Sequence, residues 1–489
     1  KMGPRAGCWQ LGDYNSSMSK KRKITAILTL SAFLFSAGLI VVPEGLGITI
    51  QEEREMAKEF MAVVSTQFPL ITDPIIVDYV NRLGKRILAV FPPQPFDYHF
   101  YVLREDVYNA FATPAGHIFF NSGLFAALES EEELAGILAH EIAHVVCRHI
   151  SDRIESSKKI SMATLAGMVA GVLLGAGGAG EVASAVTMGS MAAGQTATLA
   201  YSRQNEMQAD QLGLKYLDKA GYSGEGLLTS LKKIRSKQWY GTEQVPTYLT
   251  THPASEERMS YIDNWLHQHP AQQAKKRSET GGFELAHTRL VALYTDEKAA
   301  RNRYQLKLAE SPNDPMAHYG LALVLTRMDR WHEAAEHMKR AIEADAMATY
   351  MLQDLGMIYF NDGQYEKALE ALTAGKSGNN PEGRLYLGRT QMELDQMAEA
   401  RDTFEHLVHD YADYPPAYFY LGESSGHLGD MFAAHYHLGR YYQLKGDLRN
   451  AGFHLNRALN LAASDIEKDL AQRQLKTLPS ASVRKPGSG

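Results

Sequence analysis

Cysteine is nearly absent from this chain of 489 residues, which contains only Cys8 and Cys147. A disulfide framework is therefore excluded, and cysteine usage does not indicate the compartment. An excess of positive charge is also missing, because 50 lysines and arginines face 56 acidic residues, a formal net charge of −6. This balance argues against nucleic acid as a partner. A composition of 45% hydrophobic and 22% charged residues is typical of a soluble globular protein, and the length predicts two or three domains.

The N-terminal part of the sequence has the pattern of an export signal. Residues 20–23 are all basic, and an uncharged apolar run from Ile24 to Val42 follows them. No Ala-x-Ala cleavage site comes after the run, so both a cleaved signal peptide and an uncleaved anchor stay open for residues 18–45. We interpret residues 1–17 as an overhang before the start methionine, Met18.

A metal-binding motif occupies residues 140–144, His-Glu-Ile-Ala-His, on a helix predicted to open with a capping box at Ser130. Histidines at i and i+4 project from one helix face and can share one tetrahedral zinc, and Glu141 can then reach the attacking water. The plain alternative, two solvated histidines, is disfavoured by the apolar helix around them. Cys147 and Ile150 stand where a metzincin has glycine and histidine, which excludes that class. We expect the remaining histidines at the surface.

A carboxylate from a second helix is the expected third ligand. Glu206 and Asp210 are i, i+4 neighbours, so Glu206 can bind zinc while Asp210 accepts the free ring N–H of a ligand histidine. Taken alone, this pair is more typical of a solvated helix face. After the histidine motif, the metal-binding interpretation is favoured.

Four motifs in order resemble one known family. They are Asn-Ala-Phe-Ala-Thr-Pro-Ala-Gly at 109–116, the histidine motif at 140–144, Glu-Met-Gln-Ala-Asp at 206–210, and Thr-His-Pro at 251–253 with Arg258. The stretch is similar to the CAAX-prenyl-protease/HtpX family of zinc metallopeptidases, peptidase family forty-eight. The resemblance implies an α+β zincin-like (gluzincin) domain over residues 46–265. It also implies one Zn²⁺ per chain, with a ligand set and a general base drawn from the motifs: His140, His144 and Glu206 as ligands, and Glu141 as the base.

The resemblance assigns two further groups of residues. It places His252 near the zinc, either as a donor to the oxyanion or as an inhibitory fourth ligand, and both roles stay open. Arg258 would either stabilise the oxyanion or pair with a nearby acid. The family's edge strand, to which an extended substrate adds as a further strand, corresponds to Asn109, Ala110, Phe111, Ala112, Pro114 and Gly116.

An unusual segment at 160–201 separates the two ligand helices and contains Glu181 as its only charge. Its glycine-rich centre weakens any spanning helix. We expect a hairpin that gates the active site or makes peripheral membrane contact, with a membrane span as the alternative. Residues 266–282 are polar and predict a linker.

The C-terminal half carries tetratricopeptide (TPR) repeats. Ala322, Gly356, Gly388 and Gly422 take equivalent positions, 34, 32 and 34 residues apart, and Gly439 starts one more copy after only 17 residues. We expect an all-α TPR superhelix over 283–475, followed by a disordered tail at 476–489. Its concave surface would bind a protein partner, with a rigid spacer as the alternative.

Together these patterns predict an exported zinc endopeptidase with a repeat domain, similar to the BepA-type branch of bacterial envelope proteases. That resemblance implies a periplasmic location, free or membrane-attached. The implied substrates are unfolded or misassembled envelope proteins, and the implied role is quality control of outer-membrane proteins. The alternative is a TPR adaptor or chaperone whose zinc site is catalytically silent.

Overall fold

The computed structural model describes most of the chain in seven stretches: 48–156, 201–239, 247–253, 256–269, 280–344, 349–375 and 380–479. The expected export segment at 18–45 lies outside them, as do the last ten residues and the expected gating segment at 160–201 except for Tyr201. Two compact units make up the chain. Unit 1 comprises residues 1–70, 81–124 and 131–275, and unit 2 comprises 71–80, 125–130 and 276–489. Among the described helices, none combines the length and apolar character that a bilayer crossing requires.

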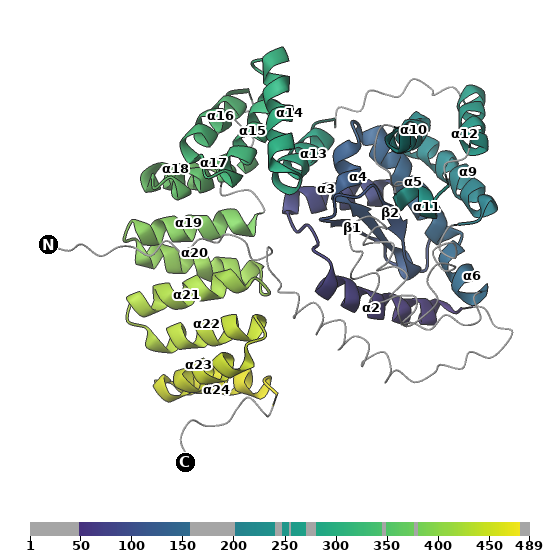
Figure 1. The fold of residues 1–489 in the computed structure, drawn as a ribbon. Helices are drawn as coiled ribbons and strands as arrows, with labels where there is room; N and C mark the ends of the chain where they lie inside the picture. Colours follow the sequence, from purple (N-terminus) through teal and green to yellow (C-terminus); the bar gives the residue numbers. More distant parts are fainter. Residues whose placement is uncertain are drawn as a thin grey trace, which may run out of the picture. The chain divides into compact units, whose positions relative to one another are not determined.

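Unit 1 contains a three-stranded sheet with the order β1-β3-β2 (Figure 1). Strand β1 (His99–Leu103) runs parallel to β3 (His117–Asn121), and β2 (Ala110–Ala112) runs antiparallel to β3. Helix α2 (Ile50–Gln67) packs apolar side chains against Phe111 and Phe119 of the sheet. Because β3 pairs on both sides, β2 is left as an edge strand.

Six further helices of unit 1 surround or carry the candidate site: α5 (Glu131–Val146), α6 (His149–Ser156), α9 (Arg203–Ala220), α10 (Glu225–Trp239), α11 (Thr247–Thr251) and α12 (Glu256–Gln268). Helix α5 is buried from Glu133 to Val145 because α9 and α10 both contact it. Its contact with α10 is very close, since a Cβ atom on Gly226 would lie 2.1 Å from the Glu132 carbonyl oxygen. Such a central helix holds its polar side chains away from water.

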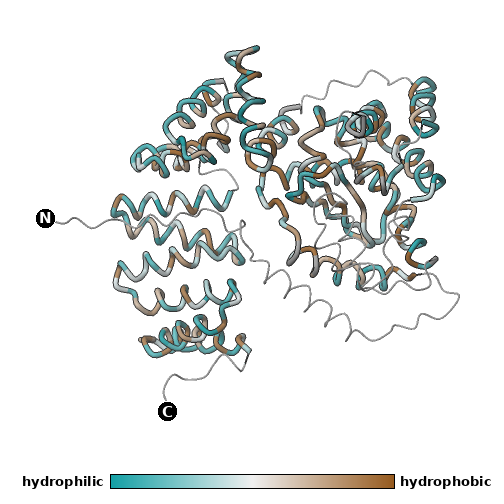
Figure 2. The backbone as a smooth tube through the Cα atoms, viewed as in Figure 1, coloured by the Kyte–Doolittle hydropathy of each residue, from teal (hydrophilic) through white to brown (hydrophobic). Residues whose placement is uncertain are grey.

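Unit 2 is a helical array. Its helices are α13 (Thr280–Tyr294), α14 (Glu297–Glu310), α15 (Pro315–Arg327), α16 (Trp331–Ala344), α17 (Thr349–Asn361), α18 (Tyr365–Ala374), α19 (Pro381–Glu393), α20 (Met397–Asp410), α21 (Pro415–His427), α22 (Met431–Leu444), α23 (Leu448–Leu461) and α24 (Asp465–Lys476). Figure 2 shows hydrophobic and hydrophilic residues alternating along these helices, as amphipathic packing requires.

The repeat glycines explain how paired helices approach each other in unit 2. A Cβ atom on Gly356 would lie 2.4 Å from Leu372, and one on Gly388 would lie 2.4 Å from Phe404. Gly439 faces Leu455 in the same way, so each glycine receives the large side chain found sixteen residues later. Helix α22 contacts both α21 and α23, which accounts for the short spacing before the last repeat.

Two short segments from the first part of the chain belong to unit 2, namely 71–80 and 125–130. Asp73 directly precedes α3 (Pro74–Leu88), and its Oδ1 accepts hydrogen bonds from the Ile75 and Ile76 amides at 3.0 and 3.2 Å. Its Oδ2 accepts from Nε and Nη2 of Arg289, at 2.9 and 2.7 Å. Arg289 also donates from Nη1 to Asp354, at 2.5 Å. This buried network ties residue 73 to the repeat helices.

Candidate metal centre

Four potential ligands from three parts of unit 1 meet at one point. They are His140 and His144 on α5, Glu206 on α9 and His252 directly after α11, and all four are buried. One donor atom from each lies within 4.8 Å of every other. The two histidine Nε2 atoms of α5 are 3.0 Å apart, and Glu206 lies 3.6 Å from His140 and 3.4 Å from His144.

These separations fit a tetrahedral metal. Ligand bonds of about 2.0–2.1 Å to zinc place neighbouring donor atoms roughly 3.3 Å apart. Nδ1 of His140 is 2.9 Å from the Asp210 carboxylate. The proton of the neutral His140 ring therefore lies on Nδ1, and Nε2 carries a lone pair. That lone pair points at a second nitrogen and at the Glu206 carboxylate, an arrangement that a cation between them stabilises. The residues therefore fit a bound divalent metal.

Arg258 on α12 links the carboxylates behind the ligands. Its Nε and Nη2 donate to the two oxygens of Asp210 at 2.6 and 2.9 Å, and its Nη1 forms an ion pair with Glu206. The side chain is 2% exposed. The sequence left two roles open for Arg258. In the structure its guanidinium contacts Glu206 and Asp210, the two acids of α9.

His252 lies between the potential ligand Glu206 and the expected general base, Glu141. Its Nδ1 is 3.0 Å from Glu206 Oε1, and its Nε2 is 3.7 Å from Glu141 Oε1. The Glu141 carboxylate makes no hydrogen bond within the described residues although it is fully buried. Tyr248 stacks on the His252 ring, with centroids 4.6 Å apart. The site therefore contains a buried carboxylate without a hydrogen bond, beside the four potential ligands.

The electrostatics suit metal binding and proton transfer. Burial lowers the pKa of His144 well below its usual value, so the ring is in the neutral form that binds metals. Burial alone would raise the pKa of Glu206, but Arg258 and His252 outweigh it and hold this pKa well below its usual range. Burial raises the pKa of Glu141, which moves this carboxyl toward the range of a general acid and base.

The expected substrate strand lies at the sheet edge. Ala110, Phe111 and Ala112 form β2, and Pro114 and Gly116 belong to the short turn η1 (Pro114–Gly116) that leads into β3. Asn109 is buried, its carbonyl accepts from the Asn121 amide at 3.0 Å, and its side-chain amide has no partner in the described part of the chain. The Tyr248 amide donates to the Tyr108 carbonyl at 2.9 Å, which ties the segment before His252 to the start of this strand.

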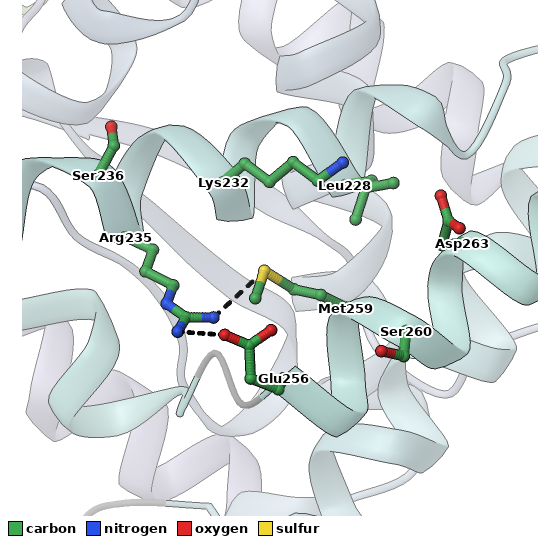
Figure 3. Close-up of a pocket in the computed structure, with 8 residues that line it drawn as sticks. All are labelled: Leu228, Lys232, Arg235, Ser236, Glu256, Met259, Ser260 and Asp263. Carbon is green, nitrogen blue, oxygen red and sulfur yellow. Dashed lines mark hydrogen bonds and ion pairs between the residues drawn. The ribbon is translucent and has the colours of Figure 1, made fainter.

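A separate groove lies between α10 and α12, with a volume of about 510 Å³. Figure 3 shows Arg235 pairing with Glu256 across it and contacting Met259. Lys232 and Asp263 add one charge of each sign. None of the four potential ligands lines this groove, so we place the chemistry at the metal centre instead.

Comparison with known proteins gives matches to both parts of the chain. Residues 77–266 match the model described as peptidase family M48, and residues 359–424 and 432–465 match models of the tetratricopeptide repeat. The chain contains a peptidase family M48 domain. The resemblance predicted from the four motifs is therefore confirmed, and so is the fold class of a metallopeptidase domain followed by helical TPR repeats.

The curated relatives that the chain resembles are named as proteases. The beta-barrel assembly-enhancing protease of Escherichia coli K12 is 24% identical over 79% of this chain and 79% of its own length. The protein of that name from Yersinia pestis is 25% identical with the same coverage. The mitochondrial metalloendopeptidase OMA1 of Schizosaccharomyces pombe is 27% identical over 41% of this chain and 55% of its own length. An M48 metallopeptidase assignment implies a metal-dependent protease.

The expectation that all remaining histidines lie at the surface was wrong. His149 is 3% exposed beside the four potential ligands, and His287 and His318 are buried in unit 2 at 8% and 3% exposure. Each has a polar partner, such as the Ala126 carbonyl for His287 at 3.2 Å, and burial of a hydrogen-bonded imidazole carries little penalty. Sequence reasoning also missed Tyr201, whose ring centroid lies 3.9 Å from that of His144.

Proposed function

We propose that the chain is a zinc-dependent endopeptidase of the HExxH…ExxxD gluzincin type. The observation that carries this proposal is the convergence of His140, His144 and Glu206 beside the buried carboxylate of Glu141, which makes no hydrogen bond in the described part of the chain. A bound Zn²⁺ would act as a Lewis acid on the peptide carbonyl and would lower the pKa of water.

The protein's own residues would then move the proton. Glu141 takes a proton from the attacking water as the new C–O bond forms, and delivers it to the departing amine nitrogen as the C–N bond breaks. No covalent bond between enzyme and substrate is needed. In this scheme Arg258 fixes Glu206 and Asp210, and Asp210 holds the Nδ1 proton of His140.

For His252 we propose the inhibitory role. Its Nδ1 lies 3.4 Å from His140 Nε2 and 3.0 Å from Glu206, which is the position of a fourth ligand. Catalytic zinc sites keep that position open for water or substrate. Cleavage would therefore require the segment after α11 to move His252 away, and the same ring could then donate to the oxyanion.

The substrates we propose are proteins of the bacterial envelope. The motifs, the order of the two domains and relatives named as beta-barrel assembly-enhancing proteases support this assignment. An extended substrate would add to β2 as a further strand, and the repeats of unit 2 would bind a client or partner protein. We place the protein in the periplasm on the same grounds.

A second candidate function is favoured by the position of His252. If the fourth ligand never leaves, the metal is silent and the chain acts as a TPR adaptor or chaperone. Both functions include metal binding, so zinc content alone does not separate them. A measurement of proteolysis at known zinc occupancy separates the two functions.

The test compares cleavage of casein and of an unfolded β-barrel protein by the wild type, Glu141→Gln and His252→Ala at equal zinc content. His267→Ala, at an exposed position of α12, is the matched control. We expect Glu141→Gln to keep its zinc and lose activity by roughly 10²- to 10⁴-fold, and His252→Ala to cleave faster than the wild type. If neither the wild type nor His252→Ala cleaves while zinc is bound, the endopeptidase is rejected and the adaptor is favoured.

A further inference from the structure

A buried histidine outside the four ligands contacts the metal centre. His149 follows the end of α5 and starts α6, and only 3% of its surface is exposed. Its Nδ1 lies 3.0 Å from Nδ1 of His144, and its Nε2 lies 3.1 Å from Oε1 of Gln208 on α9. His144, His149 and Gln208 thus form one continuous chain of polar contacts.

The backbone between α5 and α6 is built to bring His149 back to His144. Arg148 has a φ of 55°, in the left-handed region that interrupts a helix. Its guanidinium is held by Glu53 of α2, to which Nε donates at 2.7 Å. Without this reversal, position 149 would lie on another face of α5, since five residues advance a helix by about 500°.

With both rings neutral, only one arrangement of protons makes hydrogen bonds of the two contacts that join His144, His149 and Gln208. A neutral imidazole has one N–H and one acceptor nitrogen. If Nε2 of His144 offers its lone pair to the metal, its proton is on Nδ1 and is donated to His149. His149 then accepts at Nδ1 and carries its own proton on Nε2, from which it donates to Gln208. Nδ1 of His144 and both ring nitrogens of His149 are then each used in one hydrogen bond, and all of these groups are neutral.

The two ligands of α5 therefore have different supports. His140 donates to the charged carboxylate of Asp210, at 2.9 Å, whereas His144 faces a neutral ring. Partners of this kind fix the tautomer and the orientation of a ligand histidine. We propose that His149 is the positioning residue of His144, and that the contact with Gln208 keeps His149 in the tautomer that accepts. This inference depends on the proposed metal centre.

The experiment measures zinc affinity of the full chain by competition with a chromophoric chelator. In His149→Phe a carbon replaces Nδ1, so the ring fits but cannot accept, and we expect zinc binding to weaken by roughly 10- to 100-fold. In His149→Asn the Oδ1 atom stands near the place of Nδ1, and we expect most of the affinity to return. His267→Phe, at an exposed position, should bind zinc as the wild type does.

Two further measurements distinguish a positioning role of His149 from a general effect on the stability of the fold. The visible absorption of the Co²⁺-loaded protein should differ between His149→Phe and the wild type, because the orientation of one ligand changes. If His149→Phe does not fold, Gln208→Leu tests the same chain from its exposed end, with exposed Gln204→Leu on the same helix as control. We expect several-fold weaker zinc binding for Gln208→Leu only.

The possible results distinguish this inference from the function on which it rests. If the wild type binds no zinc, the metal centre itself is rejected. If the wild type binds zinc, and His149→Phe or Gln208→Leu binds it within threefold of that affinity with an unchanged Co²⁺ spectrum, the metal centre stands and the positioning role of His149 is overturned.

Discussion

Replacement of Arg289 by methionine should strongly destabilise unit 2. Arg289 is 5% exposed and holds Asp73 and Asp354, which are 8% and 4% exposed. Removing one partner of a buried ion pair costs about 3–5 kcal/mol, because a buried charge is left uncompensated. Asp73 keeps the two amides of α3, and Asp354 keeps the Tyr319 hydroxyl at 2.6 Å. Because these partners remain, the loss of unfolding free energy should lie near the lower end of that range, at about 3 kcal/mol.

Hydrogen exchange in the full chain, read by mass spectrometry on peptides from α13 and α17, measures this loss locally. A loss of about 3 kcal/mol speeds exchange from the open state by roughly a hundredfold. Arg330→Met, which removes an exposed pair with Glu333, should leave exchange unchanged. Exchange of Arg289→Met within a few-fold of the wild type would refute the view that this network stabilises the unit.

The charge left on Asp354 adds a pH dependence to the same variant. Burial raises the pKa of Asp354 even with Arg289 present, and loss of the cation should raise it further. A carboxyl whose pKa is higher in the folded state than in the unfolded state loses stability as pH rises. Arg289→Met should therefore be less destabilised at pH 5 than at pH 8. An equal loss at both values would contradict the assignment of the uncompensated charge to Asp354.

Two further predictions concern acid stability and helix packing. Burial lowers the pKa of His287 to about 4, so unit 2 should keep its full stability above the unfolded value of about 6.5 and lose about 2 kcal/mol by pH 5. Chemical denaturation between pH 7.5 and 5 should show a slope that is smaller in His287→Gln than in the wild type by about this amount, because His437, whose pKa burial also lowers to about 4, keeps its own share in both. Equal slopes would count against the assignment to His287. Gly226→Ala should destabilise unit 1 by about 1–3 kcal/mol through its clash with α5. Gly426→Ala, whose nearest atom lies 3.6 Å away, should be neutral or stabilising, and a thermal melt that ranks the two variants the other way would reject the packing argument.

Local spacing made much of the candidate site predictable. The i, i+4 patterns put His140 with His144, and Glu206 with Asp210, on single helix faces, and the structure brings all four together. The resemblance added His252, whose distance from the other motifs in the sequence gives no periodic signal. The repeat period likewise predicted the helix pairs of unit 2, because each small residue has to receive a large one from the next helix.

Two features had no signal of that kind. His149 follows His144 by five residues, and in a regular helix this spacing places the two side chains on different faces. Only the left-handed conformation of Arg148 brings His149 back to His144. The contact between Asp73 and Arg289 joins residues 216 positions apart. Such a pairing depends on tertiary packing, and a capping aspartate before a proline looks the same in the sequence whether or not it also binds an arginine.

The discontinuous make-up of unit 2 constrains how the protein is synthesised and how its gene can be divided. The ribosome releases residues 71–80 and 125–130 long before α13, so Asp73 and Phe125 must wait for Arg289 and Phe283, their partners in the finished unit. Unit 2 can therefore close only late in translation. A gene fragment that begins at the repeats lacks these early pieces, and recombination that exchanges the repeat region alone would break the unit at Asp73.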